Sequence, residues 1–233
     1  MKTARWAAAL LLGLLLSGLI ALGGLCAVSE FTSEGPNGNP VQTRISFTKG
    51  GVFLGGSITA ASLPVFAAKL AVSAVLADGP VIVSLNSVGG NLEAALRMAT
   101  SLRWAEQLAF VRTFVPNDAT CQSACTVVFA TGQDRIAGQS AVFMFHGVRW
   151  TGQNADHESA ARLEYDLERR YFEALDAADP TLVEMLKARG VFDTVAPTFL
   201  SAEEVSALGP RFISWRAPSP PPSESTPPRA DRR

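Results

Sequence analysis

The chain has 233 residues, of which 48% are hydrophobic and 18% are charged, and its formal net charge is -1. This length and hydrophobic content suit one globular domain with a sizeable core and additional terminal segments. The near-neutral charge supplies no basic surface for nucleic acid, so a nucleic-acid partner is not expected.

The first 27 residues are expected to form a leader. Lys2 and Arg5 precede an uncharged apolar run over 6–25. Such a run is typical of a secretory signal peptide, which would be cut after Ala27. Its roughly 20 residues also match an uncleaved membrane anchor, with Lys2 and Arg5 on the cytoplasmic side. Both interpretations place the rest of the chain outside the cytoplasm, either in the periplasm or tethered to the inner membrane.

A polar spacer rich in Gly, Pro, Asn and Ser is expected over 28–40, followed by a single domain over 41–216. Within the domain, short apolar runs predict strands, and apolar residues at helical spacing predict helices. The predicted strands cover 44–47, 52–54, 81–85, 110–114, 135–137 and 142–145, and the predicted helices cover 63–76, 92–102 and 123–130. The alternation predicts an α/β fold with a mainly parallel sheet.

The last third of the chain is predicted to be largely helical. Helices are expected over 157–177, 181–189 and 201–208, with a capping box formed by Ser201 and Glu204 at the start of the last one. A final strand is expected over 211–215. The Pro-, Ser- and Arg-rich tail over 217–233 has too little apolar character to bury a core and is expected to be disordered.

One serine and one histidine are candidates for catalysis. Ser123 stands among small residues where a helix is about to begin, and His146 follows the apolar strand over 142–145. A serine and a histidine brought together by folding form the nucleophile and base of a hydrolase. Each residue alone has a plainer interpretation, because a serine at a helix start is usually an N-cap and a histidine after a buried strand is usually a hydrogen-bonded core residue.

Two cysteines flank the candidate serine. Cys121 and Cys125 remain once the leader is removed, and thiols outside the cytoplasm tend to oxidise. Four residues of helix rise about 6 Å, which a disulfide can span although the geometry is awkward. The pair therefore forms either a disulfide or two small buried thiols.

Four segments in order resemble the proteolytic subunit of the Clp protease, in the wider Clp/crotonase superfamily. They are Val-Phe-Leu-Gly-Gly-Ser-Ile over 52–58, Leu-Asn-Ser-Val-Gly-Gly over 85–90, Cys-Gln-Ser-Ala-Cys over 121–125 and Ser-Ala-Val-Phe-Met-Phe-His over 140–146. The similarity covers about 44–214 and is greatest to the secreted or membrane-anchored bacterial branch. It implies stacked ββα units and a helical C-terminal handle through which subunits join, so a homo-oligomer is plausible.

The resemblance also implies a role for each matched residue. Ser123 falls at the nucleophile and His146 at the general base. The oxyanion hole would use the glycine turn at Gly89 and Gly90 together with the N–H of Ala124. Glycines suit that task because they let backbone donors approach closely. A peptide or protein substrate is implied, and no metal or cofactor is.

The third member of the triad is not assigned. The family's aspartate has Pro197 at its place, and the usual proline of the glycine turn is Val88. Asp193 lies four residues upstream of Pro197 and can substitute only if the loop bends differently. Without an acid, the histidine tautomer must be held in another way.

Three functions follow from these expectations. The first is an extracytoplasmic serine hydrolase, a Clp-like peptidase that works through an acyl-enzyme. The second is a non-catalytic Clp-like scaffold or binding protein with an incomplete triad. The third is a crotonase-like enzyme acting on acyl-coenzyme A, which the leader disfavours because coenzyme A is a cytoplasmic metabolite.

Overall fold

The structure is a computed structural model that describes residues 28–34, 40–149 and 157–217. The leader expected over 1–27 and the tail from 218 onward lie outside the described residues. The strands are β1 Val28–Glu34, β2 Pro40–Thr48, β3 Gly51–Ile58, β4 Val81–Gly90, β5 Val111–Val115, β6 Thr120–Gln122, β7 Asp134–Gly138, β8 Val142–Phe145, β9 Thr198–Ser201 and β10 Trp215–Ala217. The helices are α2 Ser62–Leu76, α3 Leu92–Ala105, α4 Ala124–Thr131, α5 His157–Ala178, α6 Pro180–Ala188 and α7 Ala202–Leu208.

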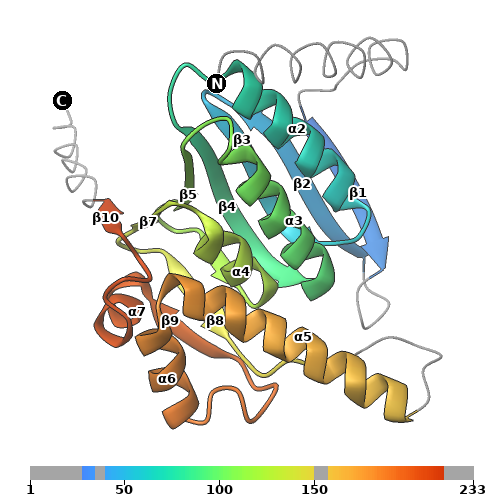
Figure 1. The fold of residues 1–233 in the computed structure, drawn as a ribbon, viewed down its shortest axis with the longest axis vertical. Helices are drawn as coiled ribbons and strands as arrows, with labels where there is room; N and C mark the ends of the chain where they lie inside the picture. Colours follow the sequence, from blue (N-terminus) through green and yellow to red (C-terminus); the bar gives the residue numbers. More distant parts are fainter. Residues whose placement is uncertain (1–27, 35–39, 150–156, 218–233) are drawn as a thin grey trace, which may run out of the picture.

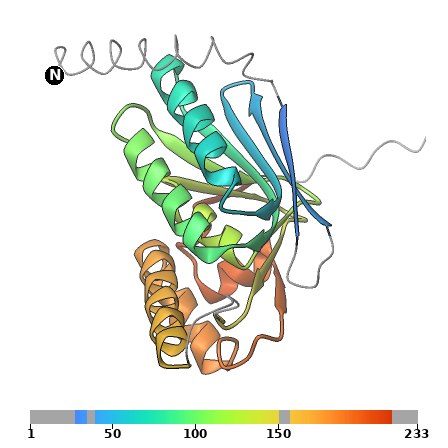
Figure 2. The ribbon, with the colours of Figure 1, turned by 90° about the vertical axis from the view of Figure 1, so that its right-hand side faces the viewer.

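The strands form one sheet, and its main path runs β1-β2-β3-β4-β5-β7-β10. The pairs from β3 through β10 are parallel, and β1 and β2 add an antiparallel edge. Helices α2 and α3 lie side by side against one face of this sheet (Figures 1 and 2). This is the α/β architecture with a mainly parallel sheet that the sequence predicts. Among the described residues, none of the helices combines the length and apolar character needed to cross a bilayer.

A short second branch leaves the sheet where β4 parts from β5. The last residue of β4 paired with β5 is Ser84, and Ser87 pairs with Cys121 of β6 instead. Strand β8 lies parallel to β6, and β9 lies antiparallel to β8. Because β6 and β8 are parallel neighbours, the residues that follow them, Ser123 and His146, emerge at the same end of this branch.

The structure corrects the sequence predictions at both ends of the domain and in β4. Residues 28–34, expected in the spacer, form β1 and pair with β2 from Val28↔Ser46 to Glu34↔Pro40. The turn expected over 86–90 is instead the end of β4. A bulge between Gly56 and Ser57 keeps β3 in register with β4 as far as Gly90. The strand expected over 211–215 begins only at Trp215, because residues 211–214 form turns and bends.

A cluster of phenylalanines holds the site's elements together. The ring centroids of Phe129 in α4 and Phe143 in β8 are 5.0 Å apart. Phe212 packs on both rings, at 5.5 Å and 6.2 Å, and also on Phe145 at 6.2 Å. Edge-to-face aromatic packing of this kind stabilises beyond simple area burial. The helix that begins after Ser123 and the strand that ends before His146 are therefore fixed to the same part of the core.

Candidate active site

Ser123 occupies a strained turn between β6 and α4. Its φ is 50° and its ψ is -121°, a sparsely populated conformation that costs a residue other than glycine about 1–3 kcal/mol. The Ser123 N–H donates to the Met144 carbonyl at 2.8 Å, and the Ser123 carbonyl accepts from the Thr126 N–H at 2.9 Å. Although Ser123 stands at the N-cap position of α4, its side chain makes no capping hydrogen bond. A serine presented on a sharp strand-to-helix turn with its hydroxyl uncommitted is the arrangement of a nucleophile elbow.

Cys121 and Cys125 form a disulfide across this turn, with their Cα atoms 5.2 Å apart. Cys121 belongs to β6 and Cys125 to the first turn of α4, so the pair does not lie on one helix. Both side chains are fully buried. The ring that the disulfide closes contains Ser123, so the bond restrains the backbone that presents the serine.

Gly89 and Gly90 are the last two residues of β4, and we keep the name glycine turn for this pair. Gly89 lies directly against Ser123. Gly89 has a φ of 82° and Gly90 a φ of 134°. A Cβ added at Gly89 would lie 2.4 Å from the Gln122 carbonyl oxygen, 3.0 Å from Ser123 Cβ and 3.2 Å from the Ala124 nitrogen. The structure therefore brings together the serine, the glycine turn and the Ala124 N–H. That N–H is the first of α4, where helix N–H groups lack an intrahelical partner.

The N–H groups of the turn differ in how they are used. Gly89 N–H donates to Ser87 Oγ at 3.1 Å, and Ser87 Oγ in turn donates to the Gly56 carbonyl at 2.6 Å. The Gly89 N–H is thus engaged within the sheet. An oxyanion at Ser123 would depend on Gly90 and Ala124.

His146 follows β8 and is half-buried. Its Nδ1 lies 2.6 Å from the carbonyl oxygen of Gly147. Since a carbonyl only accepts hydrogen bonds, this contact requires the proton on Nδ1 and leaves the Nε2 lone pair available as a base. Among the described residues, no hydrogen bond joins His146 to Ser123 Oγ, and such contacts often tighten only when substrate binds.

The segment that carries Asp193 supports Gly147 through its backbone. The Gly147 N–H donates to the Thr194 carbonyl at 2.7 Å. A Cβ on Gly147 would meet the Phe192 carbonyl oxygen at 2.4 Å. The Asp193 carboxylate is exposed and points toward Gly190, and in the described part of the chain it makes no hydrogen bond or ion pair with His146. A backbone carbonyl thus stands where a triad would have its acid.

A buried tyrosine connects the helical region to the serine turn. Thr126 Oγ1 donates to the Ser123 carbonyl at 2.7 Å, so it accepts from the Tyr171 hydroxyl, 3.2 Å away in α5. Burial raises the pKa of Tyr171 to about 12, and the hydrogen bond with Thr126 only partly opposes that shift. Helix α5 therefore has a direct link to the backbone of Ser123.

We expect Tyr171→Phe to lower the free energy of unfolding by about 1 kcal/mol at pH 8, because one buried hydrogen bond is lost. The folded state holds the Tyr171 pKa above the value of about 10 found in unfolded chains. The stability due to the neutral phenol is thus fully present below pH 10 and is lost as pH rises toward 12. Urea unfolding at pH 8 and pH 11 should show a smaller alkaline loss in Tyr171→Phe than in the native protein.

The other tyrosine is a matched control for this measurement. Tyr165 is exposed on the same helix, so Tyr165→Phe should keep both the neutral stability and the alkaline loss of the native protein. If Tyr171→Phe and Tyr165→Phe show the same dependence on pH, the buried phenol is not the group that titrates.

Fold and site together define an α/β protein that presents a serine and a histidine at the ends of neighbouring parallel strands. A solved structure of a ClpP1 point mutant from Listeria monocytogenes is similar, with a TM-score of 0.58 and 17% sequence identity over 72% of this chain and 90% of that one. At this identity the similarity shows a ClpP-like fold. No family model matches the chain, and no curated protein does.

Metal-binding side chains do not gather near this site. Within the described ranges, no group of three or more His, Cys, Asp or Glu residues could hold a metal ion.

Proposed function

We propose that the protein is a serine hydrolase outside the cytoplasm that cleaves peptide bonds through an acyl-enzyme on Ser123. The observation that carries this proposal is the backbone of Ser123. Its positive φ is unfavourable, its hydroxyl makes no capping bond, and the Gly89 turn packs directly on it. Strain of this kind persists where the surrounding structure enforces it, and it concentrates at functional sites.

The proposed reaction assigns one role to each group of the candidate site. Nε2 of His146 takes the proton of Ser123 Oγ as the oxygen attacks the substrate carbonyl, and the N–H groups of Gly90 and Ala124 stabilise the oxyanion. His146 then gives the proton to the leaving amine, and a water molecule hydrolyses the acyl-enzyme by the reverse sequence. The Gly147 carbonyl accepts the Nδ1–H of His146 throughout and so keeps the proton on that nitrogen. A neutral carbonyl stabilises the imidazolium less than a carboxylate does, so we expect slow turnover.

The surroundings of the site suit an extended peptide. Val88 lies near the end of β4 and Phe199 lies in β9. Both are large apolar side chains exposed to solvent. They would contact apolar side chains of a substrate that lies along the β6–β8–β9 branch. The leader supports a location outside the cytoplasm, and the likeness to ClpP1 supports a homo-oligomer.

The test is labelling with a fluorophosphonate probe, which reacts with activated serines. We expect the native protein to be labelled and Ser123→Ala to lose labelling completely. The unfolding midpoint should not change, because alanine bears the same backbone strain as serine. Ser101→Ala is the matched control, since Ser101 lies on α3 and donates only to the Arg97 carbonyl. Labelling that survives in Ser123→Ala would contradict the assignment of the nucleophile.

A non-catalytic scaffold is the second candidate, and one observation favours it. The Nδ1 partner of His146 is the Gly147 carbonyl, and the carboxylate of Asp193 is turned away. A scaffold would show no labelling of the native protein at any pH, with or without candidate peptides. Its cellular function would also survive Ser123→Ala.

A further inference from the structure

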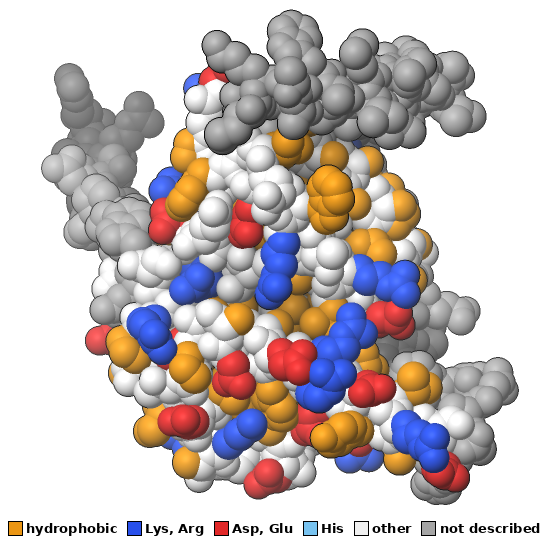
Figure 3. Space-filling view, viewed as in Figure 1, with side chains coloured by type: hydrophobic (Ala, Val, Ile, Leu, Met, Phe, Trp, Pro, Cys, Tyr) orange, Lys and Arg blue, Asp and Glu red, His pale blue; other side chains and the backbone are white. Residues whose placement is uncertain are grey.

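Helix α2 lies on the surface of the domain, yet its exposed face carries no charge. Its single charged residue, Lys69, is 2% exposed and stacks on the Phe47 ring, 4.5 Å from the centroid. Surface helices in water normally present charged or polar side chains on the side away from the core. In Figure 3 hydrophobic side chains are scattered over the upper part of the molecule with α2, whereas charged ones are most numerous over α3 and the half with α5 and α6.

The most exposed apolar side chains of this surface lie at one end of the domain. Leu76 ends α2 and Trp104 lies in the last turn of α3, and both are 73% exposed. Phe110, just before β5, is also exposed. We call Leu76, Trp104 and Phe110 the apolar pole. All three lie where β4 and β5 begin, whereas Ser123 lies beside Gly89 at the other end of β4.

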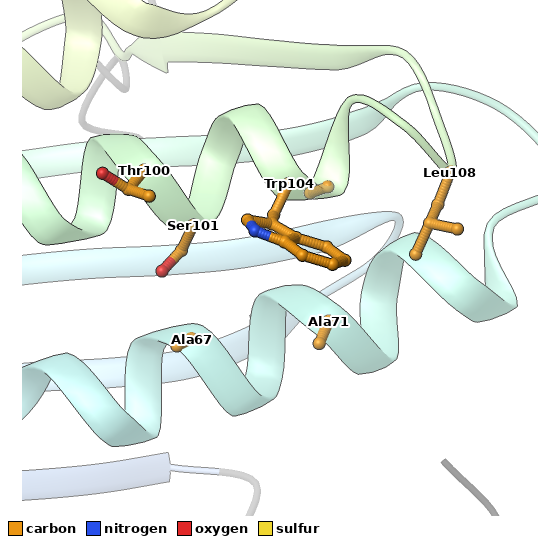
Figure 4. Close-up of a pocket in the computed structure, with 7 residues that line it drawn as sticks. Ala67, Ala71, Thr100, Ser101, Trp104 and Leu108 are labelled. Carbon is orange, nitrogen blue, oxygen red and sulfur yellow. The ribbon is translucent and has the colours of Figure 1, made fainter. Parts of the chain in front are cut away.

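A groove between α2 and α3 runs up to the pole. It is lined by the small side chains of Ala67, Ala71, Ser101 and Ala105, and the Trp104 indole lies across it (Figure 4). In the described part of the chain the indole N–H has no hydrogen-bond partner. An aromatic ring with an apolar body and an uncommitted polar edge is the side chain that membrane interfaces favour.

The leader joins the domain at this same end. Val28 pairs with Ser46, two residues before the end of β2, and the Lys49–Gly50 turn follows. The apolar run over 6–25 is long enough to cross the hydrocarbon core of a bilayer. The few residues between position 25 and Val28 reach at most roughly 10 Å. A leader retained in the membrane therefore holds the pole against the bilayer.

We propose that the apolar pole docks on the lipid bilayer, in the interfacial region beside the membrane-spanning leader. This inference rests on the anchored form of the proposed location and is independent of catalysis by Ser123. Around the pole lie two exposed cations, Lys49 and Arg103, and two acidic residues, Asp78 and Glu106. Contact with lipid is thus apolar in origin and does not need anionic headgroups.

Docking at the pole also sets where the site stands. Strand β4 has ten residues, so its far end lies about 30 Å from the pole. The Ser123 site would then face away from the membrane and toward soluble or surface-bound peptides.

The test uses the full chain in phosphatidylcholine vesicles. Replacing Trp6, Trp150 and Trp215 by Phe leaves Trp104 as the only tryptophan. We expect nitroxide-labelled phosphatidylcholine to reduce its emission by about twofold or more, because a docked indole lies at the level of the headgroups. Adding Leu76→Glu to this protein should remove most of that quenching. Met185→Glu, at an exposed position on α6, should leave it unchanged.

A second reporter marks the other end of the domain. Phe199→Trp, in a chain whose four native tryptophans are all Phe, should not be quenched. The inference is overturned if the Trp104 emission of vesicle-bound protein is not quenched. An emission that shifts in wavelength without being quenched would indicate that the pole contacts a second copy of the chain, and this result also overturns the inference. It is also overturned if the leader is cleaved and the rest of the chain leaves the membrane. Fluorophosphonate labelling of Ser123 would be unaffected by either result.

Discussion

Gly89→Ala is expected to reduce fluorophosphonate labelling of Ser123 by about 100-fold or more, because the new methyl group displaces Ser123 from the oxyanion-hole donors, which contribute on that scale. The new methyl group would lie 2.4 Å from the Gln122 carbonyl and 3.0 Å from Ser123 Cβ, so the serine turn must move. The φ of 82° adds backbone strain of its own. Strain and overpacking together should lower the free energy of unfolding by about 2–5 kcal/mol.

The chain contains two controls that separate these causes. Gly50 has a φ of 95° with no atom within 4 Å of an added Cβ, and Gly79 has the same open space without a positive φ. Gly50→Ala should therefore show backbone strain alone, and Gly79→Ala should show almost no effect. Both glycines lie at the end of the domain that carries the apolar pole, far from Ser123, so neither substitution should change labelling. Labelling of Gly89→Ala at the rate of Gly50→Ala would remove the glycine turn from the proposed site.

The strands that the sequence predicts well are those whose apolar residues form a short continuous run. Residues 81–85 and 142–145 are short apolar runs, and the structure has strands there. β1 was missed because residues 28–34 have the polar composition of a spacer, and only their pairing with β2 makes them a strand. The end of β4 was missed for a related reason. Gly89 and Gly90 are typical of a turn, yet a bulge in β4, where Val88 has no partner in β3, keeps them in the ladder.

The parts of the site that depend on side-chain identity could be proposed from the sequence, and the parts made by the backbone could not. The structure brings Ser123, Ala124 and the Gly89 turn together, and it sets His146 on the neighbouring strand. The carbonyls that support them, Met144 for the serine and Gly147 for the histidine, leave no mark in a sequence, because every residue has a carbonyl. The contact of Tyr171 with Thr126 spans 45 residues and has no local pattern either.

The disulfide is the second feature whose removal should have a large effect. A Cys121→Ala/Cys125→Ala double variant is expected to lose about 2 kcal/mol of stability, as the chain-entropy model gives for so short a loop. Labelling should also fall where this loss of stability leaves the protein folded. The sparsely populated conformation of Ser123 persists only while its surroundings enforce it, and the disulfide closes the ring around that residue. We therefore expect labelling to fall by about tenfold under conditions where both proteins remain folded.

Chemical reduction of the native chain distinguishes the effect of losing the disulfide from the effect of the two alanine side chains in the double variant. Both sulfurs are buried, so reduction requires local opening and should begin only near the unfolding midpoint or in mild denaturant. Once reduced, the native chain should label as slowly as the double variant and recover on reoxidation. Cys26→Ala, which leaves the disulfide intact, should behave like the native protein throughout. Equal labelling of the oxidised, reduced and double-variant proteins would show that the hydrogen bonds to Met144 and Thr126 hold the turn without the disulfide, which would then serve only the stability of the fold.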